Sequence, residues 1–159
     1  MTARVVGSLF IAATAAGLVS TATQGTARDL CVFLMAVAIA FIAPTLFPVL
    51  KPHGEALALG YVVARTLEVV FLTTATAQSA IYFCVSVVLL NVVLYRSKLV
   101  PRWISVWALI AVVPYLAGAV LNLLNVFTQT QVAALFVPLA LNEMVLALWL
   151  MVKGFSRSA

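Results

Sequence analysis

The sequence predicts an all-α fold, a polytopic transmembrane bundle of six helices. Of the 159 residues, 65% are hydrophobic and only 8% are charged, and the mean hydropathy is +1.21. Soluble domains carry about 25% charged residues, so a chain with so few charges could not cover a water-facing surface. The apolar residues also gather in runs of about 20, the length that an α-helix needs to cross the hydrocarbon core of a bilayer.

Six such runs follow one another along the chain. They fall at residues 5–24, 30–50, 56–78, 80–95, 103–125 and 131–152. Together they predict a single transmembrane domain over residues 1–159, with no extramembrane domain of any size.

The first run follows Arg4 and contains no charge. A cleaved signal peptide is the alternative, but the run is longer than the apolar core of a typical signal peptide, which favours a retained helix. Small residues recur in it at four-residue spacing, Ala12 with Ala16 and Ala13 with Gly17. This spacing lets helix backbones approach each other closely.

The second run follows a short polar link, residues 25–29, and contains Pro44 and Pro48. Proline removes a backbone donor and clashes with the preceding turn, so we expect a kink in this half of the helix. Pro114 and Pro138 interrupt the fifth and sixth runs in the same way. Broken helices form ion or substrate sites in some transporters, although prolines are also common in membrane helices without that role.

The third run carries two charges in its middle, Arg65 and Glu68. Residues three apart share a helix face, so these side chains point the same way. A charge at the centre of the bilayer costs about 2.5–3.5 kcal/mol on insertion scales, so the other helices must cover this face. Farther along the chain, Asn122 and Asn125 predict a polar patch near the outer end of the fifth helix.

The basic residues predict that both termini are cytoplasmic. In that orientation seven lie on the inner side, namely Arg4, Lys51, Arg96, Lys98, Arg102, Lys153 and Arg157. Only Arg28 lies on the outer side. Such an excess on the cytoplasmic side is the usual determinant of membrane topology.

Depth in the membrane predicts a contact between distant helices. Arg65 lies nine residues from the inner start of the third helix, and Glu143 lies ten residues before Lys153 at the inner end of the sixth. At the rise of an α-helix these offsets correspond to depths of roughly 14 and 15 Å. We therefore expect a buried contact between Arg65 and Glu143, with Glu68 on the same face and with Asn91 and Asn142 as further donors. Whether Arg65 pairs with Glu143, with Glu68 or with both stays open at this point.

This intramembrane network has a structural and a functional interpretation. Intramembrane charges usually pair and face the bundle interior, so the network would set the register of the third and sixth helices. One arginine with two carboxylates, however, leaves a charge of −1 if all three are ionised. Desolvation favours the protonated form of a carboxylate that lacks a partner, so Glu143 or Glu68 would then carry a proton.

Other chemistry has little support in the sequence. His53 is the single histidine and falls in a loop, so no catalytic residues, metal ligands or cofactor ligands are expected, and the chain is not expected to be an enzyme. Cys31 and Cys84 are either two small buried side chains or a disulfide pair. The basic residues do not cluster with aromatic ones, which argues against nucleic acid as a partner.

The stretches Tyr95–Trp107 and Pro138–Phe155 resemble a family of uncharacterised bacterial multi-pass membrane proteins, catalogued as a domain of unknown function, number four-three-eight-six. Residues 3–9 and 60–68 also look like this family. The resemblance implies a six-helix protein of the bacterial cytoplasmic (inner) membrane in which Arg65, Glu68 and Glu143 match motif positions, and it implies no activity. Members commonly carry a longer segment between the third and fourth helices than this chain does.

Two classes of function are therefore predicted. The first, which the sequence favours, is a small structural or accessory subunit, with membrane lipids and a larger membrane complex or a homo-oligomer as partners. Its support is the lack of a catalytic constellation, the minimal loops and the small residues of the first helix. The second is a proton- or ion-coupled transporter that uses the Arg65, Glu68 and Glu143 network. Its support is the unpaired carboxylate and the proline-containing helices, and no clear internal repeat accompanies them.

Overall fold

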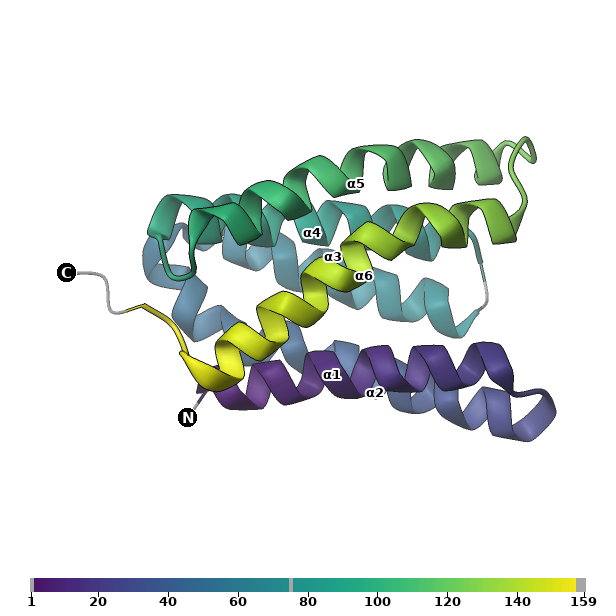
Figure 1. Ribbon diagram of the computed structural model, residues 1–159, viewed down its shortest axis with the longest axis horizontal. Helices are drawn as coiled ribbons and strands as arrows, with labels where there is room; N and C mark the ends of the chain where they lie inside the picture. Colours follow the sequence, from purple (N-terminus) through teal and green to yellow (C-terminus); the bar gives the residue numbers. More distant parts are fainter. Residues whose placement is uncertain (1, 75, 157–159) are drawn as a thin grey trace.

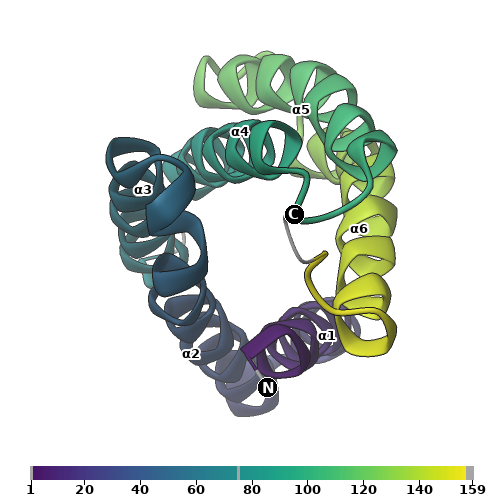
Figure 2. The ribbon, with the colours of Figure 1, turned by 90° about the vertical axis from the view of Figure 1, so that its left-hand side faces the viewer.

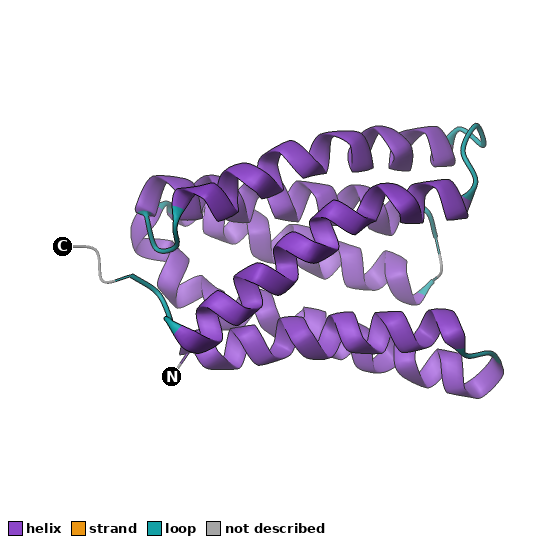
Figure 3. Ribbon diagram, in the orientation of Figure 1, coloured by secondary structure: helices purple, strands orange, loops and turns teal. Residues whose placement is uncertain are grey.

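The computed structural model describes residues 2–74 and 76–156, and every regular element in this part of the chain is a helix (Figure 3). The long helices are α1 (Thr2–Ala22), α2 (Gly25–Leu50), α3 (Glu55–Thr73), α4 (Gln78–Ser97), α5 (Arg102–Leu123) and α6 (Gln129–Val152). A 3₁₀ turn, η1 (Lys51–His53), joins α2 to α3. All six long helices are long and apolar enough to cross a membrane, which confirms the predicted fold class. Arg157, one of the predicted inner basic residues, lies outside the described residues.

The helix ends differ from the predicted runs because apolar patterning does not mark where backbone hydrogen bonding stops. The predicted polar link at 25–29 is helical, since α2 begins at Gly25 immediately after an extended Gln24. The third helix stops at Thr73 instead of continuing to residue 78. There the hydroxyl groups of Thr73 and Thr74 donate to the carbonyl oxygen of Val70, an alternative to the helical ladder that threonine offers at helix ends.

The prolines lie inside continuous helices. Pro44 and Pro48 are within α2, Pro114 is within α5 and Pro138 is within α6. Each helix therefore continues through its proline without an unwound segment, and the expected kink stays a prediction. Membrane helices tolerate proline where neighbouring groups satisfy the freed carbonyl oxygen. The prolines consequently give no separate support to a transport function.

The six helices form a closed ring (Figure 2). Each helix packs against the next one along the chain, and α6 packs against α1. The start of α1 and the end of α6 lie at one end of the bundle, called here the terminal end (Figure 1). The connections from α1 to α2 and from α5 to α6 lie at the opposite end.

Apolar side chains fill the terminal half of the ring. A buried cluster takes residues from all six helices, including Val6, Leu46, Tyr61, Leu94, Ile104 and Leu150. Phe155 packs against this cluster, and the backbone N–H of Ser156 donates to the carbonyl oxygen of Leu99 at 2.8 Å. The segment after α6 is thus held against the connection between α4 and α5.

Small residues bring α1 close to its neighbours. A Cβ atom at Gly7 would lie 2.7 Å from the backbone carbonyl oxygen of Ala147 in α6. Farther along α1, Ala13 packs with α2, and a Cβ atom at Gly17 would lie 3.0 Å from the sulfur of Met35 in α2. The predicted close approach of the Ala13 and Gly17 face therefore occurs within the chain.

Candidate functional site

A three-residue charged network spans the interior of the ring from α3 to α6. Nη1 of Arg65 donates to both carboxylate oxygens of Glu68, at 3.1 and 2.9 Å. Nη2 of Arg65 lies 3.4 Å from Oε1 of Glu143, and Nε lies 3.4 Å from the hydroxyl oxygen of Tyr61. Arg65 thus pairs with both carboxylates, which answers the question that the sequence leaves open.

The arginine is enclosed by its own chain. Arg65 is 3% exposed and Glu68 is 5% exposed. The guanidinium carbon lies 5.9 Å from the ring centroid of Phe10, 5.8 Å from that of Tyr61 and 5.3 Å from that of Phe83. Rings at these distances attract a cation electrostatically. The guanidinium group is therefore held by two carboxylates and by rings from three helices.

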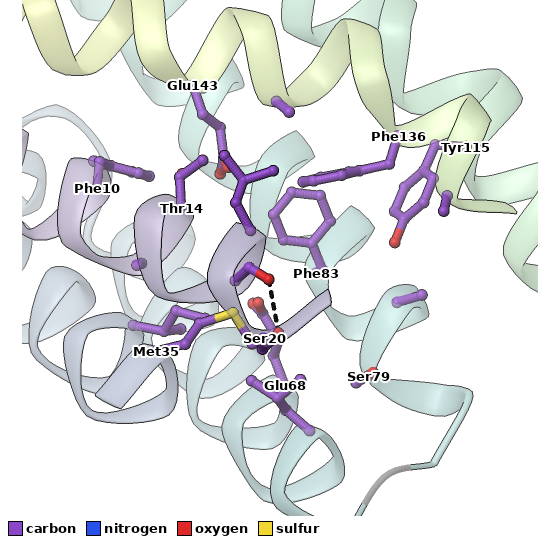
Figure 4. Close-up of a pocket in the computed structure, with 18 of the residues that line it drawn as sticks. Phe10, Thr14, Ser20, Met35, Glu68, Ser79, Phe83, Tyr115, Phe136 and Glu143 are labelled. Carbon is purple, nitrogen blue, oxygen red and sulfur yellow. Dashed lines mark hydrogen bonds between the residues drawn. The ribbon is translucent and has the colours of Figure 1, made fainter. Parts of the chain in front are cut away.

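Glu143 is the most accessible member of the network. Its side chain is 14% exposed, whereas the side chain of Arg65 is 3% exposed. Its single hydrogen bond among the described residues is the long one from Arg65 to Oε1, so Oε2 accepts none from this part of the chain. The carboxylate points into a cavity, as does that of Glu68 from the other side (Figure 4).

The cavity occupies the half of the ring that the apolar cluster does not fill. Its volume is about 660 Å³, and residues from all six long helices line it. On α1 the lining residues run from Phe10 to Thr21, whereas the core residues of the same helix run from Ala3 to Phe10. The charged network therefore lies at the floor of the cavity, where packed core gives way to open space. The volume lies within the usual range for small-molecule sites, about 300–1,000 Å³.

Three aromatic residues form part of the cavity wall, and we call them the aromatic cluster: Phe83 of α4, Tyr115 of α5 and Phe136 of α6 (Figure 4). The ring centroid of Phe83 lies 5.8 Å from that of Tyr115 and 5.6 Å from that of Phe136, and the last two lie 5.2 Å apart. Sequence reasoning missed this cluster. Single aromatic residues on three separate helices carry no spacing signal that could have revealed it.

The four asparagines that the sequence singled out take other roles. Asn91 donates to the carbonyl oxygen of Val87 in its own helix, and Asn142 donates to that of Ile104 in α5, so neither donates to the network. Asn142 precedes Glu143 directly, and adjacent helical residues point about 100° apart.

At the opposite end of the bundle, Asn122 donates to the carbonyl oxygen of Phe127 at 2.8 Å. Asn125 adopts a left-handed backbone conformation, with φ of 60°, in the same connection between α5 and α6. The expected outer polar patch thus consists of residues that shape a turn.

The remaining candidates are isolated. Cys31 and Cys84 are free thiols, and Cys84 is buried. His53 ends the short η1 segment between α2 and α3. In the described ranges, no group of three or more histidine, cysteine, aspartate or glutamate side chains is placed to hold a metal ion.

The fold and the site define a multi-pass helical membrane protein with a charged network and a cavity inside its helix ring. Residues 3–80 and 76–154 match the model of the family described as Domain of unknown function (DUF4386). These segments cover nearly the whole chain, so the protein belongs to this family, as the resemblance predicted. No curated protein and no solved structure matches the chain.

Proposed function

We propose that this protein is a proton-coupled transporter of the bacterial cytoplasmic membrane, with its ligand site in the central cavity and Glu143 as the proton-carrying group. The observation that carries the proposal is the position of Glu143. It faces the cavity and is held by one long hydrogen bond. Ionisable residues inside membrane segments commonly mark proton and substrate pathways when they line a cavity.

The charges of the network support a coupling role. Arg65 and Glu68 are joined by two short hydrogen bonds and neutralise each other. Glu143 therefore sets the net charge at the cavity floor, which is −1 when it is ionised and zero when it is protonated. A ligand that binds one of these charge states better than the other shifts the equilibrium between them, and this linkage is the basis of coupling.

Infrared difference spectroscopy of the protein in lipid nanodiscs tests the proposal. At a mildly acidic pH, at which ordinary exposed carboxylates remain ionised, we expect the carbonyl band of a protonated carboxylic acid to appear, and we expect Glu143→Gln to abolish it. Glu55→Gln is the matched control, because Glu55 lies in an exposed pair with Lys51 at the start of α3 and is not part of the network. A band that persists in the Glu143 variant would assign the proton to another group and overturn the proposal.

We also propose that both termini face the cytoplasm. Described basic residues such as Arg4, Lys98 and Lys153 lie at or beside the terminal end, whereas Arg28 lies in the first turn of α2 at the opposite end. A fluorescent protein fused to the C-terminus is expected to fluoresce in cells, and alkaline phosphatase fused there is expected to be inactive. Active phosphatase in that fusion would reverse the orientation.

The accessory-subunit and homo-oligomer hypotheses stay predictions. Part of their support was the small-residue face of the first helix, and Ala13 and Gly17 of that face contact α2 of the same chain. Native mass spectrometry of gently extracted protein separates the alternatives. A stoichiometric complex with other polypeptides would favour a subunit role, and the chain alone would favour the transporter. The proposal assigns no catalytic residue to the chain.

A further inference from the structure

We propose that the central cavity binds a lipophilic organic cation, with its positive centre placed between Glu143 and the aromatic cluster. The proposal rests on the proposed function for its site and adds the chemical class of the ligand. Charge, ring geometry and access support it separately.

The charge of the cavity floor selects for a cation. Glu143 presents a carboxylate oxygen that accepts no hydrogen bond from the described residues. Among the described lining residues the positive group is the guanidinium of Arg65, which is 3% exposed and already contacts two carboxylates and three rings. With both carboxylates ionised the cavity floor carries a net charge of −1, which a cationic ligand would neutralise and an anionic ligand would increase.

The aromatic cluster offers a second attraction to a positive centre. Phe83, Tyr115 and Phe136 come from three helices, and their rings meet at one part of the cavity wall (Figure 4). Aromatic faces attract cations, and groups of them recognise quaternary ammonium ligands in other proteins. Glu143 lies on α6 two helical turns from Phe136, so carboxylate and rings border the same space.

The cavity opens toward the region that lipid chains occupy. Leu18 of α1 and Leu141 of α6 both line the cavity and are 66% and 55% exposed. The two helices meet at the terminal end, at Gly7 and Ala147, and diverge toward the opposite end (Figure 1). A ligand dissolved in the bilayer can therefore reach Glu143 without first entering water, which requires an apolar outer surface on the ligand.

Two ions of matched shape and opposite charge test the proposal. Radiolabelled tetraphenylphosphonium is expected to bind the full-length protein in nanodiscs saturably, and tetraphenylborate is expected not to compete for its site. Glu143→Gln is expected to weaken phosphonium binding about tenfold or more, because a charge contact in an apolar site is lost. Equal competition by tetraphenylborate, or unchanged affinity of the Glu143 variant, would overturn the proposal.

A second variant tests the rings without altering any charge. Phe136→Ala is expected to weaken phosphonium binding about threefold to tenfold through the loss of a cation–π contact. Phe41→Ala is the matched control, because Phe41 is 60% exposed on α2 and does not line the cavity. Equal effects of the two variants would also overturn the proposal, and this pair remains informative if the Glu143 variant does not fold.

The binding test and the infrared test separate the two proposals. If the phosphonium ion does not bind but the Glu143 band titrates, the cation assignment falls and the proton-coupled function stands. If the ion binds through Glu143 but the band does not titrate, proton coupling falls and the cation site stands. If neither result is obtained, both proposals fall.

Discussion

Arg65→Met is expected to destabilise the protein severely, by about 3–5 kcal/mol, because it leaves two carboxylates inside the bundle without their cation. Arg65 is the group that joins Glu68 of its own helix to Glu143 of α6. Its removal therefore breaks the ion pair between α3 and α6 and also leaves the two negative charges without a positive partner. Thermal unfolding of the purified protein in a mild detergent, together with the yield of monodisperse protein, measures the effect.

Two controls identify the cause of this loss. Arg28→Met removes an exposed arginine at the opposite end of the bundle and is expected to change stability by no more than about 0.5 kcal/mol. Adding Glu68→Gln and Glu143→Gln to Arg65→Met removes all three charges, and this triple variant is expected to regain most of the lost stability. If Arg65→Met alone unfolds like the wild type, the network does not hold ionised carboxylates.

Gly7→Val is the second substitution with a large expected effect, a loss of about 1–3 kcal/mol from overpacking. A Cβ atom at Gly7 would lie 2.7 Å from the carbonyl oxygen of Ala147 and 2.7 Å from Cγ of Met151. Met151 can change rotamer, but the oxygen belongs to the backbone of α6. The side chain therefore fits only if α1 and α6 move apart, and thermal unfolding in the same detergent measures the cost.

Gly17→Val is the matched substitution in the same helix. The nearest atom to a Cβ atom at Gly17 is the sulfur of Met35, at 3.0 Å, and methionine side chains adapt readily. Gly17 also lines the cavity, so added methyl groups have space. We expect a change within about 0.5 kcal/mol. Equal losses of stability in the two variants would contradict the close contact between α1 and α6 at Gly7.

The helices and the charged network were accessible to sequence reasoning because both depend on one coordinate, position along the membrane normal. Apolar run length predicts where a helix spans the bilayer, and residue offsets then predict that Arg65 and Glu143 lie level. The cost of exposing a charge to lipid also restricts how the third helix can be oriented, since Arg65 and Glu68 had to face the bundle interior.

The cavity and the aromatic cluster were not predictable, because both depend on how six helices are arranged around the ring. Phe83, Tyr115 and Phe136 meet only because α4, α5 and α6 are consecutive in that ring. The order of helices in a bundle leaves no periodic trace in a single sequence. The same limit explains Asn142, which lies next to Glu143 in the chain but contacts α5.

The placement of the three charges on two helices has a consequence for synthesis of the protein. Arg65 and Glu68 are made together, and their pairing leaves the middle of α3 electrically neutral when that helix leaves the ribosome. Glu143 is made about 75 residues later, in the last helix, at an elongation rate of roughly 5–20 residues per second. Because α6 also packs against α1, the same final segment completes both the helix ring and the charged site. A nascent chain that lacks α6 therefore contains no finished site, and the second carboxylate enters the membrane only when the helix arrangement that places it beside Arg65 can form.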